Sequence, residues 1–161
     1  MMGSGKSVTG KSLAAMLDAA FVDLDRSLEQ RAGLPVAEIF KKHGETQFRE
    51  WETQELKGLS QSSGPLVVAT GGGIILRAEN VRWMKENGTV VYLESSPEVL
   101  WQRVKDNRSR PLLASENPRA VLERLCVERR ALYENAGSLR VQTDGRTADD
   151  VAQEIKEKLN S

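Results

Sequence analysis

The chain has 161 residues, of which 39% are hydrophobic and 29% charged, and its positive and negative charges cancel. This balance indicates one soluble globular domain and argues against a general binding surface for nucleic acid or an anionic membrane. No apolar stretch approaches a membrane span, and the single cysteine, Cys126, rules out an intrachain disulfide. We therefore expect a cytoplasmic protein and, because no long apolar stripe demands a partner, a monomer.

A glycine-rich turn near the N-terminus is the clearest sign of function. Most of the phosphate-binding pattern G-x-x-x-x-G-K-[ST] is present, in Gly3, Ser4, Gly5, Lys6 and Ser7. A helix is predicted directly behind it, over residues 7–18. In such loops backbone N–H groups surround the phosphates, the lysine reaches the β- and γ-phosphates, and the serine hydroxyl can bind Mg²⁺. We predict a phosphate site here; the alternative is a flexible tail.

The next segment predicts a short buried strand that carries two aspartates. Phe21, Val22 and Leu24 are typical of a strand, and Asp23 and Asp25 lie at its carboxyl end, where open α/β sheets bind ligands. Because alternate residues of a strand point to the same side, both carboxylates could face the phosphate loop. One carboxylate would then bind Mg²⁺, and the other would bind a substrate hydroxyl. The alternative is a pair of ordinary turn or helix-capping aspartates.

Residues 26–62 predict a helical lobe, with breaks at Gly33-Leu34-Pro35 and His43-Gly44. A buried strand is predicted at 66–69. It leads into Thr70-Gly71-Gly72-Gly73, where the backbone must turn tightly or be approached closely; a plain strand-to-helix turn is the alternative.

The second half of the chain alternates helices and strands. Helices are predicted over 77–87, from 97, over 118–136 and from 147, and strands over 89–93 and 139–142. We expect the first of these helices to end at Asn87-Gly88 in a left-handed turn. The alternation predicts a parallel sheet with helices on both faces.

A polar loop at residues 105–117 interrupts this alternation and carries Arg108 and Arg110. Long loops in compact domains are often lids, and a lid arginine can neutralise charge on a transferring phosphoryl group. The alternative is a solvated basic loop.

The order of these motifs resembles shikimate kinase over essentially the whole chain. Beyond the phosphate loop and the aspartates, the resemblance rests on Phe48-Arg49-Glu50-x-Glu52, Thr70-Gly71-Gly72-Gly73, Arg110-Pro111-Leu112-Leu113 and Glu128-Arg129-Arg130-Ala131-Leu132-Tyr133. It implies a single three-layer α/β/α P-loop kinase domain over residues 1–161, with a five-stranded parallel sheet, a helical substrate-binding lobe and a lid. It also implies ATP-dependent phosphorylation of the shikimate 3-hydroxyl, in aromatic amino acid biosynthesis.

The resemblance implies an ATP site and a Mg²⁺ site. It assigns the phosphates of ATP to Gly3, Ser4, Gly5, Lys6, Ser7 and Val8. Arg110 resembles the lid arginine that reaches ATP, and Arg146 lies where the family contacts the adenine region. Ser7 and Asp23 resemble the residues that hold Mg²⁺.

A shikimate site is implied in the same way, formed by Asp25, Arg49, Gly72 and Arg129. Asp25 resembles the residue that orients or deprotonates the attacking hydroxyl. The two arginines resemble a clamp for the substrate carboxylate. Each arginine considered alone would be interpreted as an ordinary surface residue. Gly72 resembles a backbone contact. Lys6, Asp25 and Arg110 are the implied catalytic residues.

The chain departs from the family pattern at two points. Val8 stands where threonine is usual, and we expect little effect because Ser7 supplies the metal ligand. The first glycine of the loop and the strand before it, which is central in the family's sheet, have no counterpart in the sequence. We expect the strands beside it to lose backbone partners, residues 1–161 alone to be poorly stable, and upstream residues to precede Met1.

Two other functions fit parts of the pattern. A different small-molecule kinase on the same fold, such as a gluconate kinase, would share the phosphate loop, but the motifs at Arg49 and at residues 70–73 argue against it. A non-catalytic relative that binds a metabolite or a partner is favoured only by the missing strand, because the functional positions of the motifs are all present.

Overall fold

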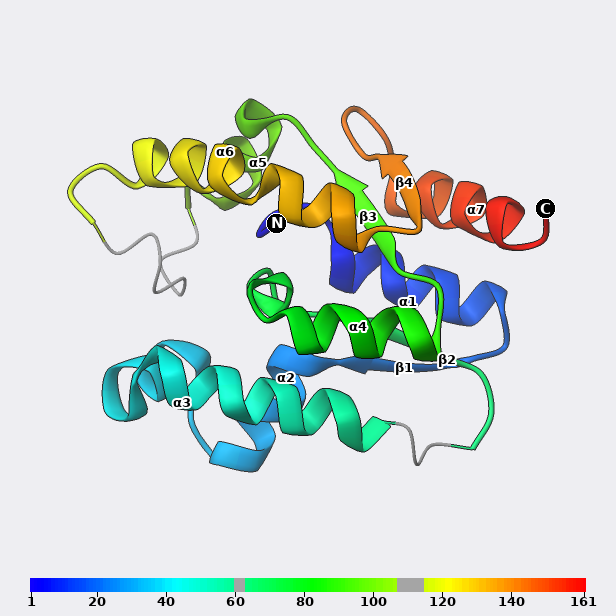
Figure 1. The fold of residues 1–161 in the computed structure, drawn as a ribbon. Helices are drawn as coiled ribbons and strands as arrows, with labels where there is room; N and C mark the ends of the chain where they lie inside the picture. The colour runs from blue at the N-terminus through cyan, green and yellow to red at the C-terminus, as the bar shows by residue number, and fades with distance from the viewer. Residues whose placement is uncertain (60–62, 107–114) are drawn as a thin grey trace.

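A computed structural model describes residues 1–59, 63–106 and 115–161 (Figure 1). As predicted, strands and helices alternate along the chain. The helices are α1 (Lys6–Met16), α2 (Leu24–Ala32), α3 (Val36–Gly58), α4 (Ala78–Asn87), α5 (Pro97–Val104), α6 (Pro118–Ala136) and α7 (Ala148–Leu159), with a short 3₁₀ turn, η2 (Ile74–Leu76). The strands are β1 (Ala20–Asp23), β2 (Leu66–Ala69), β3 (Val91–Glu94) and β4 (Leu139–Gln142).

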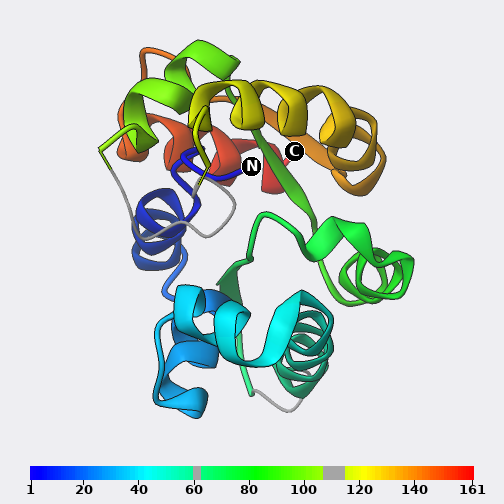
Figure 2. The same cartoon turned by 90° about the vertical axis from the view of Figure 1, so that its left-hand side faces the viewer.

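The four strands form two separate parallel pairs and not one continuous sheet. β1 pairs with β2, with Ala20 opposite Leu66, and β3 pairs with β4, with Val91 opposite Leu139. The two pairs stand apart in Figure 2. Within the described chain, β2 and β3 each have a single strand partner. The expectation that two strands lack a neighbour is therefore confirmed.

Three hydrophobic clusters hold these elements together. One lies between α1, α7 and the β3–β4 pair and includes Leu13, Val141 and Ile155. A second, around Leu28 and Phe48, gives the helical lobe a core of its own. The largest joins α2, α3, α5, α6 and η2. The lobe is thus a distinct packing unit attached to the rest of the domain.

The predicted breaks in the lobe are confirmed. Gly33 ends α2 in the left-handed region at φ 65°, and Pro35 precedes α3. Gly44 kinks α3 at φ 79°, a conformation that favours glycine. The kink lets Phe40 and Phe48 pack with their ring centroids 4.7 Å apart. None of the helices in the described residues is long and apolar enough to cross a membrane.

Two local predictions are wrong. The strand that was expected to reach Asp25 ends at Asp23, because the Asp23 side chain caps α2 by accepting a hydrogen bond from the Arg26 backbone N–H at 3.3 Å. Asp25 therefore lies in the first turn of a helix, and strand alternation does not set its direction. Gly88 has φ 178°, so α4 ends in extended backbone and not in a left-handed turn.

Candidate active site

The glycine-rich turn forms a tight loop at the start of α1. Gly3 and Gly5 have φ values of 75° and 87°, in the left-handed region, and a Cβ on Gly3 would lie 2.8 Å from a Val104 methyl carbon. Gly5 is the N-cap of α1, and no described side chain caps this helix. The first N–H groups of α1 therefore suit an anion, as the phosphate-loop pattern requires.

Lys6 and Ser4 fold back over the beginning of the chain. Lys6 Nζ donates to the Met1 carbonyl oxygen at 2.6 Å and lies 3.4 Å from Ser4 Oγ. Ser4, which is fully buried, donates to the same carbonyl at 2.9 Å. The ammonium group therefore lies over the loop, where phosphates would be bound.

Ser7 and Asp23, the predicted Mg²⁺ residues, are in direct contact. The Ser7 hydroxyl donates to Asp23 Oδ2 at 2.5 Å. No group of three or more His, Cys, Asp or Glu side chains that could hold a metal occurs in the described part of the chain. Two hard oxygen ligands nevertheless fit Mg²⁺, which keeps several waters and takes further ligands from substrate phosphates.

The carboxyl ends of the strands meet at this loop. Asp23, the last residue of β1, bonds Ser7, and the turn after β2 brings Gly72 against the Met2 backbone. Arg103 in α5 donates to the Gly3 carbonyl at 3.2 Å and to the Thr143 carbonyl, directly after β4, at 2.9 Å. Both strand pairs therefore point toward the phosphate loop, as in open α/β sheets that bind ligands at strand ends.

The four predicted shikimate residues, Asp25, Arg49, Gly72 and Arg129, line one pocket of about 70 Å³. They come from α2, α3, the turn after β2, and α6. Met2 lines the same pocket, so it lies beside the phosphate loop. Residues more than a hundred positions apart in the sequence thus form one small polar site.

Both arginines of the pocket are buried, with exposed fractions of 8% for Arg49 and 7% for Arg129. Arg49 donates to Glu52 at 2.8 Å and to Glu45 at 3.1 Å, and its guanidinium lies 5.2 Å from the centre of the Phe48 ring. Burial lowers the pKa of Arg49, but the hydrogen bonds and charges of Glu52 and Glu45 together outweigh that effect and raise the pKa. Arg129 donates a long bond, 3.5 Å, to the Gly72 carbonyl.

Glu52, which the sequence shows only as the last residue of the Phe48-Arg49-Glu50-x-Glu52 motif, is a site residue that received no role above. It is fully buried, and its Oε1 atom has no hydrogen-bond partner among the described residues. Burial raises the pKa of Glu52, Arg49 opposes that change, and the nearby Asp25 carboxylate adds to it. The spacing of Arg49 and Glu52, three residues apart on a helix, was the signal in the sequence that could have revealed the pair.

Tyr133, the last residue of the Glu128–Tyr133 motif, is a second residue that received no role above. Its hydroxyl donates to the Gly72 carbonyl at 2.5 Å, one helical turn beyond Arg129 on α6. Burial raises the pKa of Tyr133 to about 12, so the phenol stays protonated and can donate. Because Arg129 and Tyr133 both bond Gly72, α6 holds the triple-glycine turn in place. The spacing of four residues between them was visible in the sequence.

Arg146 and Arg110 are the two predicted ATP residues outside the phosphate loop. Arg146 pairs with Glu154 in α7 and donates to the carbonyls of Gln142 at 3.1 Å and Asp150 at 3.0 Å. Its contact with ATP stays a prediction. Arg110, and with it the lid prediction for residues 105–117, lies largely outside the described residues.

Comparison with known proteins gives one consistent result. A family model described as shikimate kinase matches residues 2–160. A shikimate kinase of Bacillus cereus is 39% identical over 99% of this chain and 94% of its own, and one of Actinobacillus pleuropneumoniae is 41% identical over 99% and 92%.

Solved structures agree with these sequence matches. The shikimate kinase of Acinetobacter baumannii, determined in complex with shikimate, superposes with a TM-score of 0.95 at 38% identity, over 99% of this chain and 88% of that one. The enzyme of Aquifex aeolicus gives a TM-score of 0.84 at 34% identity, over 99% and 92%. With a P-loop kinase fold and this match over nearly its whole length, the chain belongs to the shikimate kinase family of phosphate-transferring enzymes.

Proposed function

We propose that this chain transfers the γ-phosphate of ATP to the 3-hydroxyl of shikimate, giving shikimate 3-phosphate and ADP. The observation that carries the proposal is the convergence of Asp25, Arg49, Gly72 and Arg129 on one pocket beside the phosphate loop. The shikimate complex of the Acinetobacter baumannii relative supports shikimate as the acceptor.

Arg49 and Arg129 would hold the substrate carboxylate. Guanidinium groups bind carboxylates through paired, charge-assisted hydrogen bonds, and these two are already buried at the pocket. The bond from Arg49 to Glu52 keeps its guanidinium in one orientation before the substrate arrives. The substrate would therefore meet a site that needs little rearrangement, and such preorganisation favours tight binding.

Asp25 would orient the attacking hydroxyl. It stands in the first turn of α2 at the pocket, and its carboxylate is close to Gly71. The hydroxyl oxygen attacks the γ-phosphorus, and the bond between the γ-phosphorus and the β–γ bridging oxygen breaks. ADP leaves with the electron pair of that bond, and the hydroxyl proton passes to Asp25. Because such transfers depend mainly on alignment and charge neutralisation, one positioned carboxylate suffices on the acceptor side.

The phosphate loop would hold the donor. Gly3 to Val8 and the start of α1 supply backbone N–H groups, and Lys6 exchanges the Met1 carbonyl for phosphate oxygens. Ser7 and Asp23 would hold Mg²⁺, which neutralises charge on the β- and γ-phosphates when bound. We also assign Arg110 to ATP as the lid arginine and Arg146 to the adenine side; these two assignments rest on the family resemblance. The composition and apolar pattern of the sequence lead us to expect a cytoplasmic monomer of one domain.

A coupled assay of ADP release tests the proposal, with ATP, Mg²⁺ and either shikimate or gluconate. We expect ADP release with shikimate only. Asp25→Asn should lower kcat by at least about 100-fold without unfolding the protein. Asp18→Asn is the matched control, because Asp18 is exposed, has φ 51°, and asparagine tolerates that backbone well. Release with gluconate, or full activity of Asp25→Asn, would overturn the proposal.

A further inference from the structure

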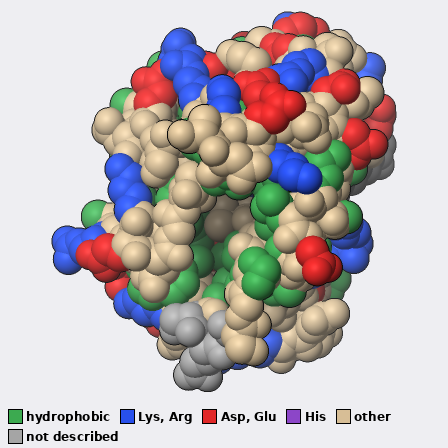
Figure 3. Space-filling view, turned by 90° about the vertical axis from the view of Figure 1, so that its right-hand side faces the viewer, with side chains coloured by type: hydrophobic (Ala, Val, Ile, Leu, Met, Phe, Trp, Pro, Cys, Tyr) green, Lys and Arg blue, Asp and Glu red, His purple; other side chains and the backbone are tan. Residues whose placement is uncertain are grey.

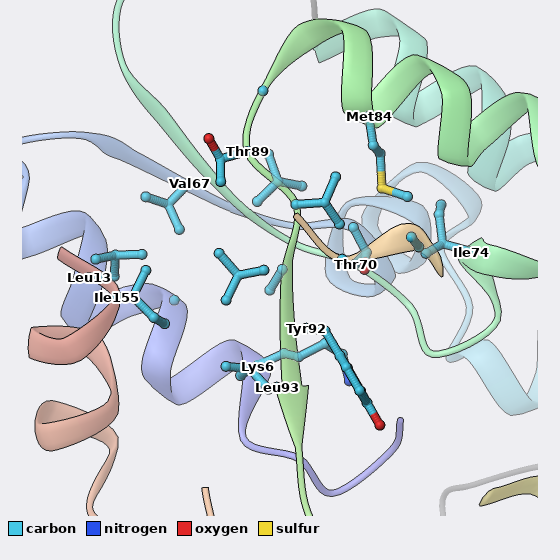
Figure 4. Close-up of a pocket in the computed structure, with 18 of the residues that line it drawn as sticks. Lys6, Leu13, Val67, Thr70, Ile74, Met84, Thr89, Tyr92, Leu93 and Ile155 are labelled. Carbon is cyan, nitrogen blue, oxygen red and sulfur yellow. The ribbon is translucent and has the colours of Figure 1, made fainter. Parts of the chain in front are cut away.

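Two cavities lie beside the triple-glycine turn, and only the smaller one is lined by a carboxylate. The larger cavity, of about 650 Å³, lies between the two strand pairs and appears in Figure 3 as a hollow bordered by hydrophobic side chains. Figure 4 shows its apolar lining, and none of the described residues that line it is an aspartate or a glutamate. Gly71 and Gly72 line both cavities, so the turn lies between them. A site for a charged ligand is therefore to be sought in the smaller cavity, the proposed shikimate pocket.

Two carboxylate oxygens meet at the first glycine of the turn. A Cβ on Gly71 would lie 2.5 Å from Glu52 Oε1 and 2.8 Å from Asp25 Oδ1, so only glycine leaves room for both oxygens. Glu52 is fully buried, and its Oε1 atom accepts no hydrogen bond from the described residues, whereas its Oε2 atom accepts one from Arg49. Because a buried acceptor without a donor costs free energy, the Oε1 atom marks a position that is suited to a donor on a ligand.

The charged side chains around this pocket balance one another before a substrate binds. Arg49 and Arg129 supply two guanidinium groups, and Asp25 and Glu52 supply two carboxylates. Arg77, which also acts on Glu52, is partly exposed and has a carboxylate partner of its own. A substrate carboxylate would add a third negative charge beside side chains that are largely buried. Because a buried charge without a compensating charge is costly, a cationic group on the ligand would restore the balance.

We propose that Asp25 and Glu52 form a cation subsite in this pocket, which binds carboxylates that carry an ammonium group in place of the attacking hydroxyl. The ligand carboxylate would lie on Arg49 and Arg129, and the ammonium would donate to Asp25 beside the Glu52 charge. Because attraction between opposite charges is stronger away from bulk water, such a ligand should bind more tightly than shikimate. A protonated amine has no lone pair with which to attack phosphorus, so it should inhibit the transfer. The inference rests on the proposed function, which places the attacking hydroxyl at Asp25.

Calorimetric titration without ATP tests the cation subsite, with shikimate and with the analogue that carries an amino group in place of its 3-hydroxyl. The wild type should bind the amino analogue about tenfold more tightly than shikimate at neutral pH. Glu52→Gln, which removes the buried charge and keeps the shape, should lower this ratio to about threefold or less, and so should Asp25→Asn. Glu45→Gln is the matched control and should leave the ratio unchanged. Glu45 also pairs with Arg49, at 3.1 Å, but it is exposed and does not line the pocket.

Because both ligands share the carboxylate, any movement of Arg49 affects them alike and cancels in the ratio of their affinities. Equal affinities of the wild type for the two ligands would overturn the proposal, as would a wild-type ratio that persists in Glu52→Gln. If Glu52→Gln does not fold, a ratio that persists in Asp25→Asn would overturn it in the same way. Failure of the proposed function would look different, because the wild type would then neither bind shikimate nor release ADP in its presence.

Discussion

We propose that Arg49 and Arg129 make the same kind of contact with the substrate, yet the structure predicts that their loss affects stability very differently. Arg49 is bonded at 2.8 Å to Glu52, a fully buried carboxylate. Arg129 has no carboxylate within ion-pair distance among the described residues, and it contacts only neutral groups there: the Gly72 carbonyl, through a long bond, and the Tyr133 hydroxyl. Arg49→Ala would therefore leave a buried charge without its partner, whereas Arg129→Ala would not.

The expected losses in the free energy of unfolding differ clearly between the two variants. Removing one partner of a buried ion pair costs about 3–5 kcal/mol, whereas losing a single neutral-acceptor hydrogen bond costs about 1 kcal/mol. For a domain of this size, 1 kcal/mol shifts Tm by about 2–4 °C. Arg49→Ala should thus melt about 5–15 °C below Arg129→Ala, although both raise KM for shikimate.

Thermal and urea unfolding of the two variants provide the assay. A double variant, Arg49→Met with Glu52→Leu, is the control, because replacing both members of a buried pair by apolar residues is often neutral or stabilising. It should recover most of the stability that Arg49→Ala loses, without recovering shikimate binding. Equal stability of Arg49→Ala and Arg129→Ala would show that the Arg49–Glu52 pair does not hold the site together.

Three further predictions concern neighbouring parts of the site. Ser7→Ala should raise the Mg²⁺ concentration for half-maximal rate by at least about tenfold, as measured by ADP release, and an unchanged Mg²⁺ dependence would argue against its role. A Cβ on Gly73 would overlap the Arg49 guanidinium, so Gly73→Ala should raise KM for shikimate but not for ATP. Gly58→Ala, in open space within α3, should leave both KM values unchanged. The folded state favours the neutral phenol of Tyr133, whose pKa rises from 10.0 to about 12. Its contribution to the free energy of unfolding is therefore complete below pH 10 and falls by about 2.3 kcal/mol as the pH rises to 12. Urea unfolding across this pH range should show that loss in the wild type and not in Tyr133→Phe; parallel curves would refute it.

Local signals in the sequence were sufficient to predict most of the fold. Glycine and proline positions predicted the breaks at Gly33 and Gly44. The lack of the strand that precedes the phosphate loop in the family predicted that two strands would each lack a neighbouring strand. The strand end at Asp23 could not be predicted in the same way. Strand propensity and helix capping compete at that residue, and the cap on α2 prevails, which places Asp25 in a helix.

The residues that the resemblance assigns to shikimate line one pocket, but the sequence did not show which residues hold them in position. Glu52 and Tyr133 act through other residues: one orients Arg49, and the other holds the Gly72 turn. Helical spacing shows which residues share a face, but it does not show which face is buried against a distant turn. That information comes only from tertiary packing, here of α3 and α6 against the segment after β2.

The most direct test of the account is a comparison of shikimate with its methyl ester, by calorimetric titration of the wild type and of Arg129→Ala. A clamp of two buried arginines requires a carboxylate, so the wild type should bind shikimate at least about 100-fold more tightly than the ester. Arg129→Ala should reduce that ratio to about tenfold or less. If the ratio is the same in both proteins, Arg129 does not bind the substrate carboxylate and the proposed site is wrong.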